Sequence, residues 1–409
     1  MNTLPADRYD VAIVGGGMVG ASLALALAGT RLRVLLIEAV AASNVTQPSF
    51  DDRTTAVGNG ARRILQTLGV WDAIESRATP IREIHVSDAG RFGFARLRAS
   101  EHGLSALGYC VVNRHIGAAL WDALQNSHRI ELCSPARVTQ VTLEPSMARL
   151  HVCSAANVER TIEARLVVAA DGANSLVKQA AGIVSENSSY EQLAVVANIR
   201  TDRNAHGVAY ERFSAAGALA ILPLYDGAYT VVWTLPPELA LAMRECSEEE
   251  FCRELQSSFG WRIGRVMQAG QRSSYPLALI RAGASTGERV ALVGNAAQSL
   301  HPVAAQGFNL GLRDAAVLAE LVAAADDPGA PDLLKRFAAN RASDRAGMIG
   351  FTDRLVKLFR TQRIPAVALR NLGLLLFDVS PAAKQALSRL SWGFGGALPR
   401  LSRGLPLQP

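Results

Sequence analysis

The sequence has few cysteines, no clustered metal ligands and no long apolar run, and each absence excludes a class of protein. Its five cysteines are scattered over 409 residues without a C-x-x-C pair. We therefore expect reduced thiols in a cytoplasmic protein, with no disulfide framework and no metal site. No stretch reaches the ~20 apolar residues that span a bilayer. The apolar run from Val11 is expected to be a strand, because it lacks the cleavage site of a signal peptide.

Charge is also scarce, and it is unevenly placed. Charged residues make up 19% of the chain, and the net charge is +6. Residues 351–409 hold nine basic and two acidic side chains, which leaves 33 basic and 34 acidic ones for residues 1–350. The basic character therefore belongs to the C-terminal tail, and we expect no nucleic-acid partner.

The tail also contains an apolar segment, residues 364–377, that is only 14 residues long. Two interpretations of it stay open. It is either a helix packed on the protein with a solvated basic face, or an interfacial element that contacts anionic lipid. The second interpretation predicts a peripheral protein on the inner face of the cell membrane.

A glycine-rich turn near the N-terminus carries the first positive signal. The run Gly15-Gly16-Gly17-Met18-Val19-Gly20 fits G-x-G-x-x-G between a predicted strand and a predicted helix. Gly15 allows the tight turn, Gly17 lets the backbone approach a pyrophosphate, and Gly20 lets the helix and strand pack closely. Glu38 ends the next strand and is placed to bind a ribose. The run predicts a dinucleotide site but does not separate NAD from FAD.

Two further turns follow buried strands far along the chain. Asp171-Gly172 follows the strand 165–170, and Gly294-Asn295 follows the strand 289–293. A helix then opens at Gln306-Gly307-Phe308-Asn309, where backbone N–H groups and the helix dipole favour an electron-rich ring. Each turn alone is also explained as an ordinary helix cap. Together they indicate one extended cofactor that touches three distant segments, and a flavin dinucleotide fits best.

Weaker candidates lie near these turns. Arg53 and Arg114 are either solvated charges or partners of the pyrophosphate or flavin. His301 is either structural or a proton carrier. Pro302 removes one donor and stiffens the loop.

The order of predicted elements indicates an α/β protein. We expect a Rossmann-like, three-layer FAD-binding domain assembled from residues 1–80, 111–183 and 279–345. An antiparallel-sheet substrate domain (81–110 and 184–278) is inserted into it, and a helical C-terminal region (346–409) follows. Helices are expected over residues 54–68 and 113–125. Alternation in residues 229–234 predicts a strand with one covered face.

The motifs resemble those of the class A flavoprotein aromatic monooxygenases, and more closely the ubiquinone-biosynthesis hydroxylases, over nearly the whole chain. The resemblance to the 2-polyprenyl-6-methoxyphenol hydroxylase branch rests on Glu211-Arg212-Phe213 and on the 294–302 run. The family usually has Asp, His, Arg and Gly at four positions where this chain departs. The runs that carry the family resemblance are 10–17, 52–57, 171–175, 293–302 and 306–311, and the departures are Asn295, Gln298, Lys178 and Ala305.

The resemblance implies FAD, NAD(P)H as reductant and O₂, with hydroxylation of a polyprenylated phenol in ubiquinone biosynthesis through a flavin C4a-hydroperoxide. Leu219 and Ile221 are expected to line a dry substrate pocket that lacks a carboxylate anchor. His301 is the candidate acceptor for the phenol proton. Other ubiquinone-pathway enzymes are possible partners. The alternatives are a flavin oxidoreductase for another aromatic or isoprenoid substrate, and a non-catalytic lipid-binding subunit.

Overall fold

A computed structural model describes residues 7–41, 51–361, 363–391 and 398–407. Its larger domain is built on a sheet whose strands run in the order β18-β19-β11-β1-β2-β8. The central pairs β1–β2, β1–β11, β2–β8 and β11–β19 are parallel. Their Val, Ile, Leu and Ala runs are buried, as expected for a parallel sheet covered on both faces. The strands are β1 (Asp7–Val14), β2 (Val34–Ile37), β8 (Ile130–Cys133), β11 (Glu159–Ala169), β18 (Thr286–Gly287) and β19 (Val290–Leu292).

Two different layers cover this sheet. Val11 and Ile13 pack in one core with the helices, whereas Ala12 and Val14 pack in a second core with an antiparallel hairpin. Alternation along β1 therefore fixes which layer each side chain meets. The three-layer FAD-binding architecture expected from the sequence is confirmed. The helices are α1 (Met18–Leu27), α4 (Asn113–Gln125) and α8 (Gly307–Ala323), and the hairpin is β9 (Ala136–Leu143) with β10 (Ala148–Ser154).

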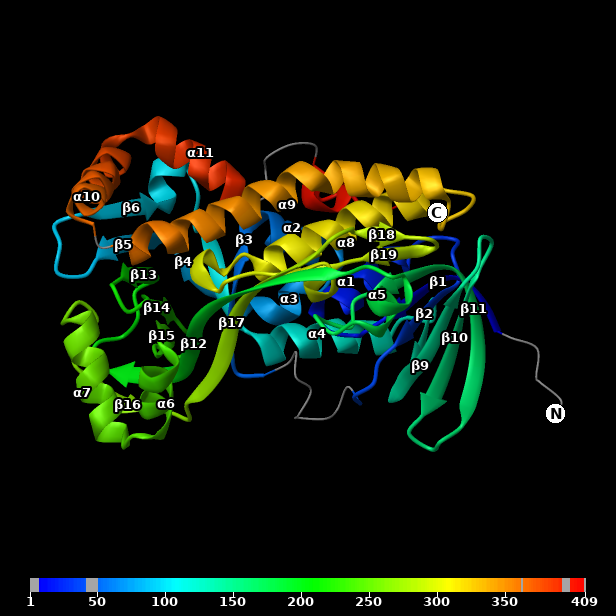
Figure 1. Cartoon of the computed structure of the whole chain (residues 1–409), viewed down its shortest axis with the longest axis horizontal. Coiled ribbons are helices and arrows are strands. Elements are labelled where there is room, and N and C mark those ends of the chain that lie inside the picture. The colour runs from blue at the N-terminus through cyan, green and yellow to red at the C-terminus, as the bar shows by residue number, and fades with distance from the viewer. Residues whose placement is uncertain (1–6, 42–50, 362, 392–397, 408–409) are drawn as a thin grey trace.

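The inserted sheet lies at the other end of the molecule (Figure 1). Its order is β20-β17-β12-β15-β14-β13-β5-β6. Helices α6 (Pro237–Glu245) and α7 (Glu248–Phe259) pack on one face. The prediction of one covered face for 229–234 is wrong, because Thr230 and Thr234 on the opposite face are also buried. The strands are β5 (Glu83–Asp88), β6 (Phe94–Arg98), β12 (Ser185–Thr201), β13 (Val208–Phe213), β14 (Ala218–Pro223), β15 (Tyr229–Leu235), β17 (Ser273–Ala282) and β20 (Gln298–Ser299), and β16 (Val266–Ala269) pairs with β12.

A small sheet separates these two units. Strand β3 (Thr54–Gly58) pairs with β7 (Gly108–Val112), which also pairs with β4 (Thr79–Ile81). The helix predicted over 54–68 therefore begins late, as α2 (Asn59–Thr67). The β-branched start of this segment pairs with β7 instead of forming a helical turn.

The C-terminal helices join the two ends of the molecule. Helix α9 (Pro331–Arg360) packs on α8 and extends from the segment 279–345, expected in the FAD-binding domain, into the expected C-terminal region. Helix α10 (Ile364–Val379) packs on β6, and α11 (Pro381–Ser391) follows it. The chain then returns to the first domain, where Leu401 and Leu407 enter the main core.

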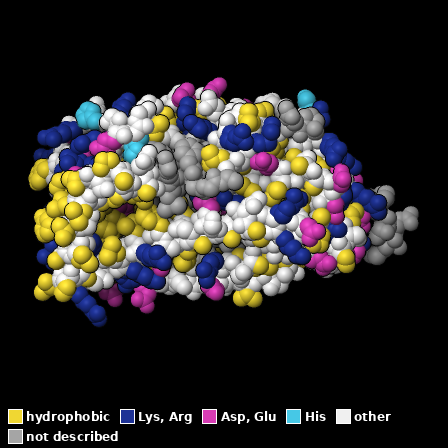
Figure 2. Space-filling model, turned by 90° about the horizontal axis from the view of Figure 1, so that it is seen from above, with side chains coloured by type: hydrophobic (Ala, Val, Ile, Leu, Met, Phe, Trp, Pro, Cys, Tyr) yellow, Lys and Arg dark blue, Asp and Glu magenta, His cyan; other side chains and the backbone are white. Residues whose placement is uncertain are grey.

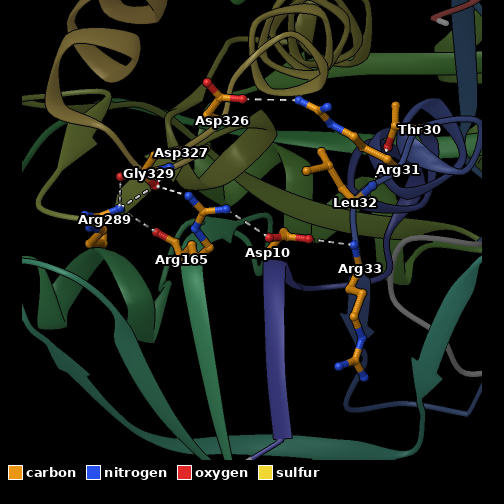
Figure 3. Close-up of polar contacts among 10 residues, drawn as sticks. All are labelled: Asp10, Thr30, Arg31, Leu32, Arg33, Arg165, Arg289, Asp326, Asp327 and Gly329. Atoms are coloured by element: carbon orange, nitrogen blue, oxygen red, sulfur yellow. Dashed lines mark hydrogen bonds and ion pairs between the residues drawn. The ribbon is translucent and has the colours of Figure 1, made fainter. Parts of the chain in front are cut away.

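Ion pairs tie the amino-terminal side of the parallel strands to the α8–α9 connection (Figure 3). The Arg289 guanidinium contacts both Asp327 oxygens at 2.7 and 2.8 Å. Arg165 lies between Asp327 and Asp10, at 3.6 and 3.2 Å from their carboxylates. These ion pairs lie at the end of the strands opposite to the carboxyl end, which carries the glycine turns.

Candidate cofactor and substrate site

The first and second glycine turns touch each other directly. Gly15 has φ +102°, and a Cβ there would lie 2.5 Å from the carbonyl oxygen of Ala170, which precedes Asp171. A Cβ on Gly20 would lie 1.9 Å from the Gly15 carbonyl oxygen. Both positions therefore require glycine, for the close approach of β1, β11 and α1.

Val19 joins the first turn to the third. Its side chain fills the space beside two glycines: a Cβ on Gly294 would lie 3.3 Å from Val19 Cβ, and one on Gly311 would lie 3.0 Å from Val19 Cγ2. The start of α1, the Gly294 corner and the first turns of α8 are thus packed together. The three turns meet at the carboxyl ends of β1, β11 and β19, where open α/β sheets bind ligands.

The first turn presents backbone donors and one buried carboxylate. Glu38 accepts hydrogen bonds from Gly16 N at 2.6 Å and from Val40 N at 2.8 Å. The Trp121 indole donates to Gly16 O at 2.9 Å and holds the turn in place. Gly17 begins α1 without a side-chain cap, so the first amides of the helix are left for an anion. Met18, the first residue of the helix, is partly exposed beside them.

The Asp171-Gly172 turn holds an incompletely bonded carboxyl group. Asp171 Oδ2 accepts from Leu176 N at 3.0 Å, whereas its Oδ1 is buried without a hydrogen-bond partner among the described residues. Burial raises the pKa of this carboxyl group. Gly172 has φ +88° with open space beside it. The vacant acceptor suits a hydroxyl donor such as those of a ribityl chain.

Ser175 and Lys178 belong to the turn itself. Ser175 Oγ caps α5 (Leu176–Ala180) by accepting from Lys178 N at 3.0 Å. The buried Lys178 ammonium donates to Ala173 O at 2.6 Å. Lys178, which stands where the family usually has arginine, thus stabilises its own loop through this hydrogen bond.

At the start of α8, Asn309 acts as a clamp. Its Oδ1 accepts from Gly58 N at 2.9 Å, and its Nδ2 donates to Ala56 O at 2.8 Å and Ala305 O at 3.0 Å. The side chain joins β3 to α8 and is not aimed at open space.

The other candidate residues of this region differ in exposure. Gln306 is buried and Phe308 packs at the core. Gly307 has no neighbour near its Cβ position, and Asn295 is exposed.

The two arginine candidates are paired with the loop that carries Arg53. Arg53 binds Asp51 and lies over the Tyr275 ring, 4.8 Å from its centroid. Arg114 binds Asp52. Both guanidinium groups stay about half exposed at the edge of the site. Either guanidinium group can bind an anion only by sharing, or giving up, its ion pair with the aspartate.

His301 is placed as a donor, which weakens its candidacy as a base. It is 2% exposed, and its Nδ1 accepts from Val303 N at 3.2 Å. Burial lowers its pKa to about 4, so the ring is neutral and carries its proton on Nε2. Tyr190 packs edge-on against the ring at 4.8 Å. Pro302 precedes the single turn 303–305 that leads to α8.

The prediction that Leu219 and Ile221 line the substrate pocket is wrong. Both are buried against α6 and α7, on the face of β14 that points away from the glycine turns. Alternation along the strand separates two faces, but it does not tell which face meets the helices. Ala220 and Leu222 on the other face are partly exposed. That face also carries Glu211 of β13, which sequence reasoning used only for the family resemblance.

These observations fit FAD. Uncapped amides suit its pyrophosphate, Glu38 suits a ribose, and Asp171 offers a vacant acceptor. No cluster of three metal-ligating side chains occurs in the parts of the chain that the structure describes.

Comparisons with known proteins agree with this fit. A family model described as an FAD binding domain matches residues 8–352. The chain is 37% identical to ubiquinone hydroxylase UbiL of Rhodospirillum rubrum, over 98% of this chain and 94% of that protein. It is 31% identical to the 3-demethoxyubiquinol 3-hydroxylase of Escherichia coli, over 94% and 98%. Human ubiquinone biosynthesis monooxygenase COQ6 is 29% identical, over 93% and 92%.

Solved structures share the fold. The p-nitrophenol 4-monooxygenase PnpA of Pseudomonas putida superposes with a TM-score of 0.78 at 18% identity, covering 93% of this chain and 97% of that one. The flavin-dependent monooxygenase PieE, solved with FAD and substrate, gives 0.72 at 19% identity, covering 98% and 73%. The chain therefore belongs to the FAD-dependent class A monooxygenases, within the family of ubiquinone-biosynthesis hydroxylases.

Proposed function

We propose that this chain hydroxylates the ring of a polyprenylated phenol in ubiquinone biosynthesis, using FAD, NAD(P)H and O₂. The observation that carries the proposal is the meeting of three remote turns in one cradle through Gly15, Gly20 and Val19. The names of the near-full-length relatives support the substrate class. Those names include several hydroxylases, so the choice of the 2-polyprenyl-6-methoxyphenol branch stays a prediction.

When FAD is bound and has been reduced by NAD(P)H, it supplies the chemistry that transfers one oxygen atom of O₂ to the ring. The protein's part is to bind, orient and exclude water. Glu38 and the amides of α1 would hold one end of the cofactor, and Asp171 and the Gly294 corner would hold the other. The face of β13 and β14 that carries Ala220 and Leu222 covers the site with small and apolar side chains, which exclude water.

A labelled-oxygen assay tests this function. The purified chain is loaded with FAD and given NADH or NADPH, ¹⁸O₂ and a panel of prenylated phenols. We expect one ¹⁸O atom in a ring hydroxyl of the product. NAD(P)H oxidation that yields only hydrogen peroxide would instead support a flavin reductase. A chain that takes up no FAD would support the non-catalytic subunit.

We further propose that helix α10 contacts the membrane that holds the substrate. The helix turns its polar residues inward: Arg370 and Asn371 are buried and bind Asp88 of β5. Val367 is also buried, and Leu374 and Phe377 pack against core clusters, but other apolar side chains face outward, with Leu369 71% and Leu376 58% exposed. An ordinary surface helix carries polar side chains on its outer face, whereas this helix exposes leucines there. Hydrophobic side chains gather at this end of the molecule in Figure 2.

Cations beside α10 favour an anionic lipid surface as the partner. The end of α9 and the start of α10 carry exposed basic side chains, and Ile364 is 83% exposed among them. Among the described residues, no single helix is long and apolar enough to span a bilayer, although α10 and the start of α11 pass that test as a pair bent by 91°. We therefore propose a peripheral position on the cytoplasmic face of the membrane. The basic side chains are Arg354, Lys357, Arg360 and Arg363.

Vesicle flotation tests the contact without disturbing the fold. We compare the double variant Leu369→Glu/Leu376→Glu with a control, Leu239→Glu/Leu241→Glu, on the exposed side of α6. On vesicles of phosphatidylglycerol and phosphatidylcholine, only the α10 variant should lose binding, because it places anions in the contact. Equal binding by both variants would contradict the proposal. Truncation at 361 is a poor test, because Leu401 and Leu407 belong to the main core.

A further inference from the structure

Glu211 is an acidic side chain on the sheet face that closes the site. It lies on β13, between Ala209 and Phe213 on the same face. Ala209 packs in a cluster with Cys110 of β7, and Phe213 packs in a cluster with Val303, which leads to α8. The carboxyl group therefore lies between the small sheet and the loop before α8.

The surroundings of Glu211 are apolar. Its cross-strand neighbours are Ala220 on β14 and Val86 on β5. Its Oε1 atom is buried without a hydrogen-bond partner among the described residues. Arg212 is directed elsewhere and donates to Ser258 O at 3.1 Å. A buried acceptor without a partner is costly, and a ligand that donates a hydrogen bond would remove the cost.

The described ionisable groups around this part of the sheet are neutral or already paired. His301 and Cys110 are kept neutral because burial lowers the pKa of the one and raises that of the other. The pKa of Tyr190 is raised to about 12, again by burial. Asp88 is bound by Arg370 at 2.5 Å. Burial alone raises the pKa of Glu211 to about 8, so it is poised near physiological pH.

We propose that the Glu211 carboxylate binds the phenolic hydroxyl of the substrate and accepts its proton. The inference rests on the proposed function. The phenol O–H bond breaks and an O–H bond forms on Oε1, which leaves negative charge on the ring oxygen and activates the ring. The ring carbon gains its oxygen atom from O₂, with reduced FAD as the electron donor, and then releases its hydrogen as a proton, which ends in the water molecule that the same reaction forms. Glu211 then returns its own proton to the ring oxygen, and the carboxylate is regenerated.

This assignment replaces His301, whose geometry opposes the role. Its Nδ1 lone pair is used by Val303 N, and its Nε2 carries the proton. A phenol proton would have nowhere to go without an imidazolium forming in a buried site. A carboxylate with one vacant oxygen has no such obstacle.

The variant Glu211→Gln tests the proposal in the FAD-loaded enzyme. For the wild type, kcat/KM for the prenylated phenol should rise with pH towards a plateau above about 8. In Glu211→Gln it should fall by about 10²–10⁴-fold and lose this rise. Glu211→Asp should keep the rise at a lower rate. The control Glu83→Gln lies on the opposite face of β5, where its carboxylate binds Arg98, and should behave as wild type.

A second readout does not depend on turnover. Difference infrared spectra of the wild-type holoenzyme should show a protonated carboxyl band that shifts when 2-methoxyphenol is added. The band should be missing from Glu211→Gln. No shift, or a wild-type pH profile in Glu211→Gln, would overturn the role of Glu211. If the wild type itself makes no hydroxylated product, the proposed function fails instead.

Discussion

Replacing Asn309 by Asp changes one NH₂ group to one oxygen atom at the clamp between β3 and α8. The amide donates to Ala56 O at 2.8 Å and to Ala305 O at 3.0 Å. Both hydrogen bonds are lost, and an anionic oxygen then faces two carbonyl oxygens. Each lost bond costs about 1 kcal/mol, and each acceptor left without a partner costs about 1–3 kcal/mol if it is buried. We expect the free energy of unfolding to fall by about 2–5 kcal/mol.

The loss should depend on pH with a definite sign. The introduced carboxyl group is buried beside two acceptors, so its folded pKa lies above the unfolded value of about 3.9. Below that unfolded value the group is protonated in both states, and its O–H restores one bond. Stability should therefore fall as pH rises through about 4 and beyond, until the folded pKa is passed.

Urea unfolding at pH 4 and pH 7 measures both effects. The same substitution at the exposed Asn295 is the control, and we expect a change within about 0.5 kcal/mol there. Bound FAD, read from visible absorbance per protein, should decrease in Asn309→Asp because the start of α8 loosens. A loss below about 1 kcal/mol at pH 7, equal to the control, would refute the clamp.

Further substitutions test other parts of the structure. Gly20→Ala should abolish FAD retention, because its Cβ would lie 1.9 Å from a carbonyl oxygen, whereas Gly29→Ala should retain the flavin because its nearest contact is 3.5 Å away. His301→Phe should flatten the loss of stability that the wild type shows as pH falls from 6.5 to about 4, since only the unfolded histidine takes up a proton there; an unchanged slope in urea unfolding would contradict this. Arg370→Met leaves the buried Asp88 carboxylate without its cation and should cost about 3–5 kcal/mol in urea unfolding, with Arg370→Lys intermediate; wild-type stability in both would refute the pair.

Backbone requirements made the cofactor cradle predictable from sequence. Gly15 and Gly20 stand where no side chain fits, so the sequence must show glycine there. Helix α4 matches its predicted bounds because apolar spacing and the preceding strand agree. The role of Val19 is different. Its packing between Gly294 and Gly311 depends on residues nearly 300 positions away, and no local pattern reports it.

The sequence does not show toward which neighbouring element each side chain of a strand or helix is oriented. Alternation in β14 shows two faces, but only tertiary packing decides that Leu219 meets the helices and Ala220 meets the site. The same limit applies to α10, where the sequence does not show that the single arginine, Arg370, is buried on Asp88. Likewise, the apolar surroundings of Glu211 come from neighbours on two other strands, β14 and β5.

The return of Leu401 and Leu407 to the main core has a consequence for biosynthesis of the protein. Strand β1 pairs with β11, which is made more than a hundred residues later, and β11 also pairs with β19. Leu401 and Leu407 leave the ribosome almost 400 residues after β1. The cradle should therefore remain open on the nascent chain until residue 407 has emerged, and flavin capture should follow that step.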